Sequence, residues 1–173
     1  MFRDSKEFCL LDKPVHRIPM EWIQELFKVY KDQPKAMFLF IGELTHDSTL
    51  QGNANQINIA DEDLVKFLGK LKENGELDNT IVIMMSDHGS RFSALRGKIQ
   101  GKYEERLPYF GIYFPQRFKD DFPDAYNNFK GNIDKLTSPF DIYESLKDVA
   151  EYGGVKDVDI KTMRGISLFN KVP

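Results

Sequence analysis

The sequence has a single cysteine and no long apolar run, and these absences exclude several classes of protein. Cys9 is the one cysteine among 173 residues, so neither an internal disulfide framework nor a cysteine-based metal site can form. No apolar stretch approaches the roughly 20 residues that a membrane-spanning helix needs. Charges interrupt the first residues, MFRDSKEFCLLDK, so they lack the apolar region of a signal peptide. We therefore expect no membrane span in this chain, and these features leave its compartment open.

A strong excess of charge of one sign is also missing. Lys and Arg number 24 and Asp and Glu number 27, which gives a net charge of -3. No global field would therefore draw the chain to nucleic acid or to an acidic membrane. Neither a Gly-rich phosphate loop nor a G-x-S-x-G nucleophile elbow is present. The composition, with 41% apolar and 29% charged residues, is that of an ordinary globular domain.

Three short apolar segments alternate with helical patterns. The runs AMFLFIGE (36–43), IVIMMS (81–86) and YFGIYF (109–114) are each followed by polar or turn-forming residues, which is typical of strands covered on both faces. Apolar spacing predicts helices over 19–31, after residue 58 (with Leu64, Phe67, Leu68 and Leu71 in its buried stripe), near 123–130, and from Pro139. The tail around 164–169 predicts a further short strand. Buried strands alternating with helices predict an α/β fold with a largely parallel sheet flanked by helices.

Long polar loops follow the first two predicted strands, and each begins with histidine and acidic residues. The first is ELTHDS (43–48) and the second is SDHGSR (86–91). Ligands bind beyond the carboxyl ends of the strands in parallel α/β sheets. We therefore expect the two clusters to meet at one edge of the sheet and to form the functional site.

Asp87 and His88 are the candidate metal ligands. A carboxylate and a neutral imidazole suit a divalent ion such as zinc or manganese. The glycine that follows them lets the backbone swing, so both side chains can aim at one point. Two ligands are too few for zinc, and the first cluster could add one or more of Glu43, His46 and Asp47. The alternative is that His88 only caps or hydrogen-bonds a nearby carbonyl.

The loop after the second strand is rich in cations. Such side chains would hold an anionic group near the metal, and arginine would do so bidentately. The candidate substrate-binding residues are Arg91, Lys102 and Arg106. The alternative for any one of them is a solvated charged face, with Glu104 and Glu105 as counter-charges.

The ordered segments ELTHDS, LDNTIVIMMSDHG, QGKYEERLP and SPFDI closely resemble the DUF229 family of the alkaline-phosphatase-like (sulfatase-like) superfamily. The resemblance covers nearly all of the chain from about Phe38. It implies a metal-dependent site for phosphate, phosphonate or sulfate esters, in which Asp87 and His88 bind the metal. His46 is the counterpart of a histidine near that site. The resemblance thus predicts a divalent ion (zinc, manganese or calcium) and an anionic ester substrate.

The superfamily keeps its nucleophile and its first metal-binding acid upstream of these segments, and no equivalent segment precedes Phe38. We therefore expect the C-terminal half of a catalytic domain, with residues 1–34 as a helical lead-in and 35–173 as the partial domain. No catalytic residue is assigned within the chain, and the chain would be inactive alone. A half-domain also exposes part of its sheet, which predicts a partner covering it.

Two alternatives to the hydrolase fragment remain open. One is a non-catalytic module that binds a metal or an anion, and the other is a purely structural α/β domain. The family resemblance suggests the secretory pathway or the extracellular space, although the chain carries no signal peptide.

Overall fold

The computed structural model describes residues 8–42, 44, 53–89, 94–151 and 164–173, with the backbone alone for 53–57 and 94–95. The chain divides into two compact units, Met1–Tyr113 (unit 1) and Phe114–Pro173 (unit 2). Each unit is described by itself. The predicted boundary between residues 34 and 35 stays a prediction.

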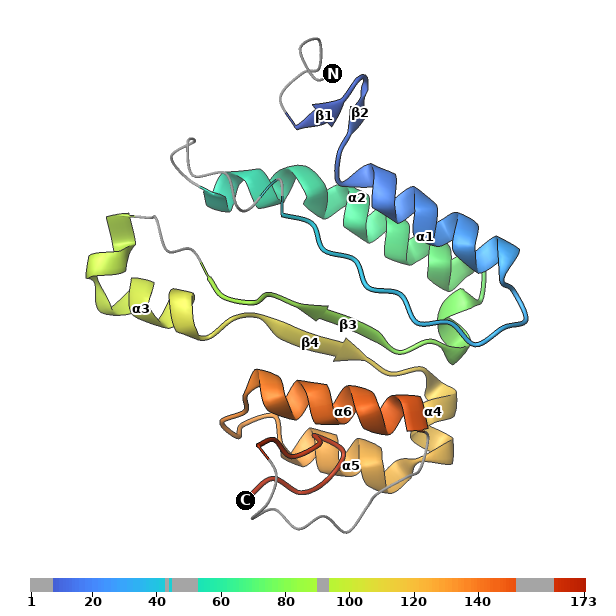
Figure 1. The fold of residues 1–173 in the computed structure, drawn as a ribbon, viewed down its shortest axis with the longest axis vertical. Helices are drawn as coiled ribbons and strands as arrows, with labels where there is room; N and C mark the ends of the chain where they lie inside the picture. Colours follow the sequence, from blue (N-terminus) through green and yellow to red (C-terminus); the bar gives the residue numbers. More distant parts are fainter. Residues whose placement is uncertain (1–7, 43, 45–52, 90–93, 152–163) are drawn as a thin grey trace. The chain divides into compact units, whose positions relative to one another are not determined.

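Unit 1 combines two long helices with short strands (Figure 1). It opens with the hairpin β1 (Cys9–Leu10) and β2 (Lys13–Pro14), followed by α1 (Arg17–Val29), α2 (Asn53–Glu73) and the 3-10 helix η1 (Glu76–Asn79). The chain continues through β3 (Val82–Met85), the 3-10 helix η2 (Ala94–Gly97), α3 (Ile99–Arg106) and β4 (Phe110–Tyr113). The helices predicted over 19–31 and after residue 58 are thus confirmed as α1 and α2, and α2 starts earlier than expected.

The predicted α/β fold, with a largely parallel sheet flanked by helices, is wrong. Among the described residues, the strands form two antiparallel pairs, β1 with β2 and β3 with β4. The second pair runs from Val82 opposite Tyr113 to Met85 opposite Phe110. Apolar continuity along a segment predicts that the segment is buried, but it does not specify the direction of its partner strand. Here η2 and α3 return the chain beside β3 in the opposite direction.

Two further segments that were predicted as strands have no strand pairing. Residues 36–42 run without strand assignment, and the tail over 164–169 forms bends and turns. The first segment still alternates as an extended chain does. Met37 and Ile41 pack against the core, whereas Phe38 and Phe40 are 88% and 70% exposed.

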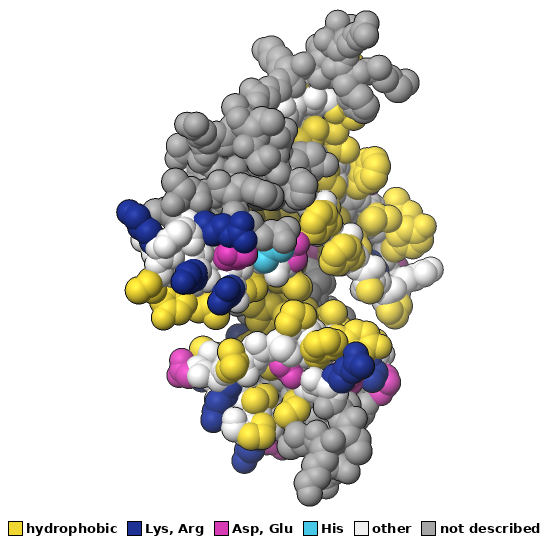
Figure 2. Space-filling model, turned by 60° about the vertical axis from the view of Figure 1, so that its left-hand side comes forward, with side chains coloured by type: hydrophobic (Ala, Val, Ile, Leu, Met, Phe, Trp, Pro, Cys, Tyr) yellow, Lys and Arg dark blue, Asp and Glu magenta, His cyan; other side chains and the backbone are white. Residues whose placement is uncertain are grey.

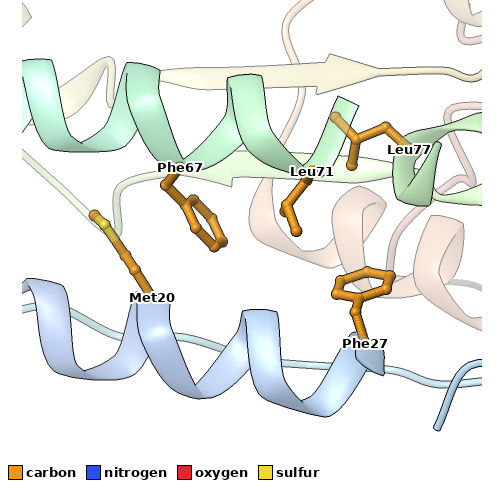
Figure 3. Close-up of a cluster of buried hydrophobic side chains, with 5 residues drawn as sticks. All are labelled: Met20, Phe27, Phe67, Leu71 and Leu77. Atoms are coloured by element: carbon orange, nitrogen blue, oxygen red, sulfur yellow. The ribbon is translucent and has the colours of Figure 1, made fainter. Parts of the chain in front are cut away.

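The core of unit 1 lies between α1, α2 and η1 (Figure 3). Met20 and Phe27 come from α1, Phe67 and Leu71 from α2, and Leu77 from η1. Spacings of four and seven residues put each helical pair on one face. Burial of each such side chain contributes about 1.5–3 kcal/mol to the free energy of unfolding. The predicted stripe of α2 is confirmed, since Leu64 and Leu68 also pack against this cluster.

A polar contact joins the start of α1 to α2. His16 is only 1% exposed, and its Nε2 donates a hydrogen bond of 2.8 Å to Asp63 Oδ2. Arg17 binds the same carboxylate with two nitrogens, Nε at 2.6 Å and Nη2 at 2.8 Å. The bond from Arg17 lowers the pKa of Asp63, the bond from His16 acts in the same direction, and burial opposes both. The carboxylate thus satisfies a buried imidazole nitrogen.

Unit 2 packs three helices around a group of aromatic rings. The helices are α4 (Gln116–Asp121), α5 (Pro123–Gly131) and α6 (Pro139–Glu151). The ring centroids of Phe114 and Phe118 lie 5.0 Å apart, and Phe169 from the C-terminal segment joins both rings. The helices predicted near 123–130 and from Pro139 are confirmed.

Side chains in unit 2 hold the C-terminal segment as a sheet ladder would. Asn132 is buried, and its Nδ2 donates to the carbonyls of Leu168 and Asn170 at 3.0 and 2.7 Å. Asp141 accepts the backbone N–H groups of Ser138 (2.6 Å) and Ile166 (2.7 Å). The first of these bonds caps α6, and the second brings the SPFDI and RGISLF segments together. The two segments therefore form one structural module.

In the parts of the chain described above, none of the helices combines the length and the apolarity that a membrane span requires.

The polar contact to α2 yields a stability prediction. Asp63→Asn should lower the free energy of unfolding of unit 1 by about 1–3 kcal/mol at neutral pH, because it weakens the bonds to Arg17 and to the buried His16. Urea unfolding measures the difference. Asp61→Asn, at an exposed position of the same helix, is the matched control.

The same pair of variants gives a pH dependence with a defined sign. The pKa of Asp63 is lower in the folded protein, so its contribution is fully present above the unfolded value of about 3.9. That contribution is lost as the pH falls through the folded pKa. The difference between wild type and Asp63→Asn should therefore shrink below about pH 4. An equal difference at pH 3 and pH 7 would contradict this account.

Candidate functional site: the end of β3

The SDHG segment begins where the pairing of β3 with β4 ends. Ser86 donates its backbone N–H to the carbonyl of Tyr109 at 2.9 Å. Tyr109 returns a backbone N–H bond to Ser86 Oγ at 3.1 Å. The serine hydroxyl thus takes the place of the next backbone acceptor. This exchange fixes the point at which the chain leaves the strand, and therefore the position of Asp87.

The structure brings Asp87 and His88 together. Asp87 Oδ1 accepts the backbone N–H of His88 at 2.9 Å, and Oδ2 lies 3.5 Å from His88 Nε2. The two side chains are 65% and 40% exposed. Neither is therefore needed to fill a core, and both are accessible to a ligand from solvent.

The hydrogen bond of His88 Nδ1 defines the state of the ring. Nδ1 lies 2.8 Å from the carbonyl oxygen of Gly89. A carbonyl can only accept, so Nδ1 carries the hydrogen, and in a neutral imidazole Nε2 then keeps its lone pair. The alternative that His88 binds a nearby carbonyl is thus correct for Nδ1. It leaves Nε2 available for a metal ion.

Gly89 packs directly against the last turn of α3. Its N–H donates to the carbonyl of Glu105 at 3.1 Å. A Cβ atom at this position would overlap the carbonyl oxygen of Glu104. The requirement for glycine is therefore one of space, because any side chain would push the segment away from the helix. Carbonyls in the last turn of a helix lack intrahelical partners, and Gly89 satisfies one of them.

Two of the predicted substrate-binding residues lie on α3. Lys102 and Arg106 are exposed there, and within the described residues no carboxylate forms an ion pair with either. Arg96 of η2 is 3.7 Å from Glu105 and neutralises part of its charge. On the face that Figure 2 shows, basic side chains gather together with acidic ones near a histidine. Lys102 and Arg106 are thus the α3 cations that no described carboxylate pairs with, and Glu104 and Glu105 of the same helix balance their charge.

The other predicted site residues lie outside the described residues. These are His46 and Arg91, together with Glu43 and Asp47. The expected meeting of the two polar clusters at one sheet edge is likewise not described. Among the described residues, no group of three or more His, Cys, Asp and Glu side chains is arranged to hold a metal ion.

Sequence reasoning missed three contributors to this site. Ser86 and Tyr109 fix the end of the strand, and the carbonyl of Glu105 binds Gly89. A serine at the last position of an apolar run is a signal for the first contact, because its hydroxyl can replace a backbone acceptor. Nothing in the sequence points to the carbonyl of Glu105, since every residue has a backbone carbonyl.

Comparisons with known proteins show one similar protein and one matching family. Over 113 residues, 62% of the chain, it is 31% identical to the "Uncharacterized sulfatase YdeN" of Escherichia coli (strain K12). Residues 2–173 match the family described as "Protein of unknown function (DUF229)". The chain belongs to the DUF229 family.

The similarity covers only a small part of the relative. The matched region spans 18% of the length of YdeN. No solved structure matches the chain.

The exposure of Asp87 and His88 gives a prediction for metal binding. Zinc, manganese or calcium should raise the melting temperature of the wild type, because an ion that binds only the native state stabilises it. Asp87→Ala and His88→Ala should each abolish this rise and leave the metal-free melting temperature nearly unchanged, since both side chains are exposed. At one hundred times its Kd the ion contributes about 2.7 kcal/mol.

Differential scanning calorimetry with each ion measures the effect. Asp12→Ala, another exposed acid of unit 1, should keep the full metal response. If both site variants instead failed to fold, Asp87 and His88 would have a structural role.

Proposed function

We propose that the chain supplies the metal-binding and anion-binding part of a hydrolase that acts on phosphate- or sulfate-type esters. Asp87 and His88 hold a divalent ion, with His46 as a further ligand. Lys102, Arg106 and Arg91 bind the anionic group. The proposal assigns no catalytic nucleophile to these residues.

The separation of the two donor atoms carries the proposal. Asp87 Oδ2 and His88 Nε2 are 3.5 Å apart. Zinc binds oxygen and nitrogen at about 2.0–2.2 Å, so adjacent ligands of a tetrahedral ion are roughly 3.4 Å apart. The lone pair of Nε2 is free because Nδ1 donates to Gly89. The two side chains thus fit one edge of such a coordination shell.

The electrostatic surroundings also favour this function. The negative end of the α3 dipole lies at Gly89 and favours positive charge nearby. Lys102 and Arg106 on the same helix supply charge for an anion. A site that attracts both a cation and an anion suits an ester whose oxygens carry negative charge.

A bound divalent ion would supply Lewis-acid chemistry, which stabilises the charge that develops at phosphorus or sulfur. Asp87 and His88 would hold this ion through Oδ2 and Nε2. Lys102 and Arg106 hold the non-bridging oxygens of the ester and oppose the growth of negative charge. The relationship to a sulfatase supports an ester of this kind.

A non-catalytic module that binds a metal or an anion is the second candidate. The exposure of the Asp87 and His88 side chains, 65% and 40%, supports it, because enzyme active sites generally close over the substrate and exclude bulk solvent. The two candidates differ in turnover, while both require the same ligands.

Metal-dependent binding of inorganic phosphate and sulfate tests the proposal. Calorimetric titration of either anion into the zinc-loaded or manganese-loaded protein should give an affinity that falls at least tenfold without the metal. Lys102→Ala and Arg106→Ala should each lower the affinity for the anion by about tenfold, as expected for the loss of one charge-assisted contact. Lys70→Ala, at an exposed position of α2, is the matched control and should change nothing.

The same preparations are then given nitrophenyl phosphate and nitrophenyl sulfate. Turnover that requires both the metal and Asp87 supports the hydrolase. Binding of metal and anion without turnover agrees with both candidates, because the proposal assigns no nucleophile to this chain. Anion affinity that is independent of metal, or equal in all three variants, would overturn the proposal.

A further inference from the structure

We infer that Gly89 is a positioning residue that couples helix α3 to the imidazole of His88. Both of its backbone polar groups take part, the N–H towards the helix and the carbonyl towards the ring. The inference rests on the proposed function for what the site binds. The coupling itself is a property of the contacts around Gly89.

The first link joins Gly89 to the helix. Its N–H donates to the carbonyl of Glu105 at 3.1 Å, in the last turn of α3. The absence of a Cβ atom allows this approach, because any Cβ would overlap the Glu104 carbonyl. The carbonyl groups of Glu104 and Glu105 thus both lie against the glycine. A larger residue cannot take its place unless this segment or the helix moves.

The second link joins Gly89 to the ring of His88. Its carbonyl accepts the hydrogen of Nδ1 at 2.8 Å. This bond selects the tautomer in which Nε2 keeps its lone pair. The partner of the nitrogen that does not bind a metal generally sets ring orientation and ligand strength. Here that partner is the backbone of the next residue.

The two links act in series, from Glu105 to Gly89 and from Gly89 to His88. A shift of the last turn of α3 would move the peptide units on both sides of Gly89, and so the acceptor of Nδ1. Lys102 and Arg106 belong to the same helix. Gly89 therefore fixes the position of His88 Nε2, the proposed metal ligand, relative to Lys102 and Arg106, the proposed anion-binding residues.

The substitution Gly89→Ala tests this coupling. Its matched control is Gly97→Ala in η2, because a Cβ at Gly97 meets no atom within 4 Å. Nitrogen NMR of the labelled imidazoles at about pH 8 reports the tautomer. Wild type and Gly97→Ala should show His88 with hydrogen on Nδ1. Gly89→Ala should shift the hydrogen towards Nε2, with the zinc affinity reduced by about 10–100-fold.

A loss of stability that leaves the protein folded would not by itself change the ring tautomer, so in the folded variant this signature separates positioning from a structural role. If Gly89→Ala keeps the wild-type tautomer and metal affinity, the inference is wrong while the proposed function stands. If the tautomer shifts but neither protein binds a metal, the coupling stands and the proposed function fails.

The wild type gives a second test that does not depend on the folding of a variant. The Gly89 amide should exchange with solvent as slowly as the Leu107 amide, which bonds to Tyr103 in the last turn of α3. His88 should show the Nδ1-protonated ring in the same sample. Fast exchange of Gly89, or hydrogen on Nε2 in the wild type, would overturn the inference.

Discussion

The close approach of Gly89 to the last turn of α3 is the constraint that determines the geometry around β3. The segment Asp87–Gly89 leaves the strand after the exchange of hydrogen bonds between Ser86 and Tyr109. It is then held by the carbonyl of Glu105, and only a residue without a side chain fits there. Because one short segment is fixed at both ends, the side chains between those ends need no core packing to be oriented. That is how exposed residues can keep a defined separation.

This arrangement separates the scaffold from the chemistry. The buried apolar side chains of unit 1 come from α1, α2 and η1. The polar contact of His16 and Arg17 with Asp63 joins the start of α1 to α2. Neither depends on Asp87 or His88, which are exposed at the strand end. In unit 2, Asp141 serves α6 and the C-terminal segment, so the SPFDI segment has a structural role. Substitutions at Asp87 and His88 should therefore act on metal binding, if it occurs as proposed, before they act on folding.

Much of this could be read from the sequence where the signal is local. The stripe of α2 and the start of α6 at Pro139 follow from spacing and capping, and the abrupt end of the apolar run located Asp87 and His88. The direction of the strands could not be read, because an apolar run records burial and not the partner that provides it. The role of Gly89 was also misjudged. The sequence suggested backbone freedom, whereas the requirement is the space left by a missing Cβ. That space is limited by Glu104 of α3, fifteen residues further along the chain.

The central claim is that Asp87 and His88 bind one divalent ion through Oδ2 and Nε2. Anomalous X-ray scattering at the zinc edge, from crystals of the zinc-loaded protein, tests it most directly. The account predicts a zinc peak at about 2.0–2.2 Å from both atoms, with Nδ1 of His88 still bonded to the Gly89 carbonyl. The absence of a peak there at saturating zinc, or a zinc ion bound elsewhere with both side chains unliganded, would contradict it.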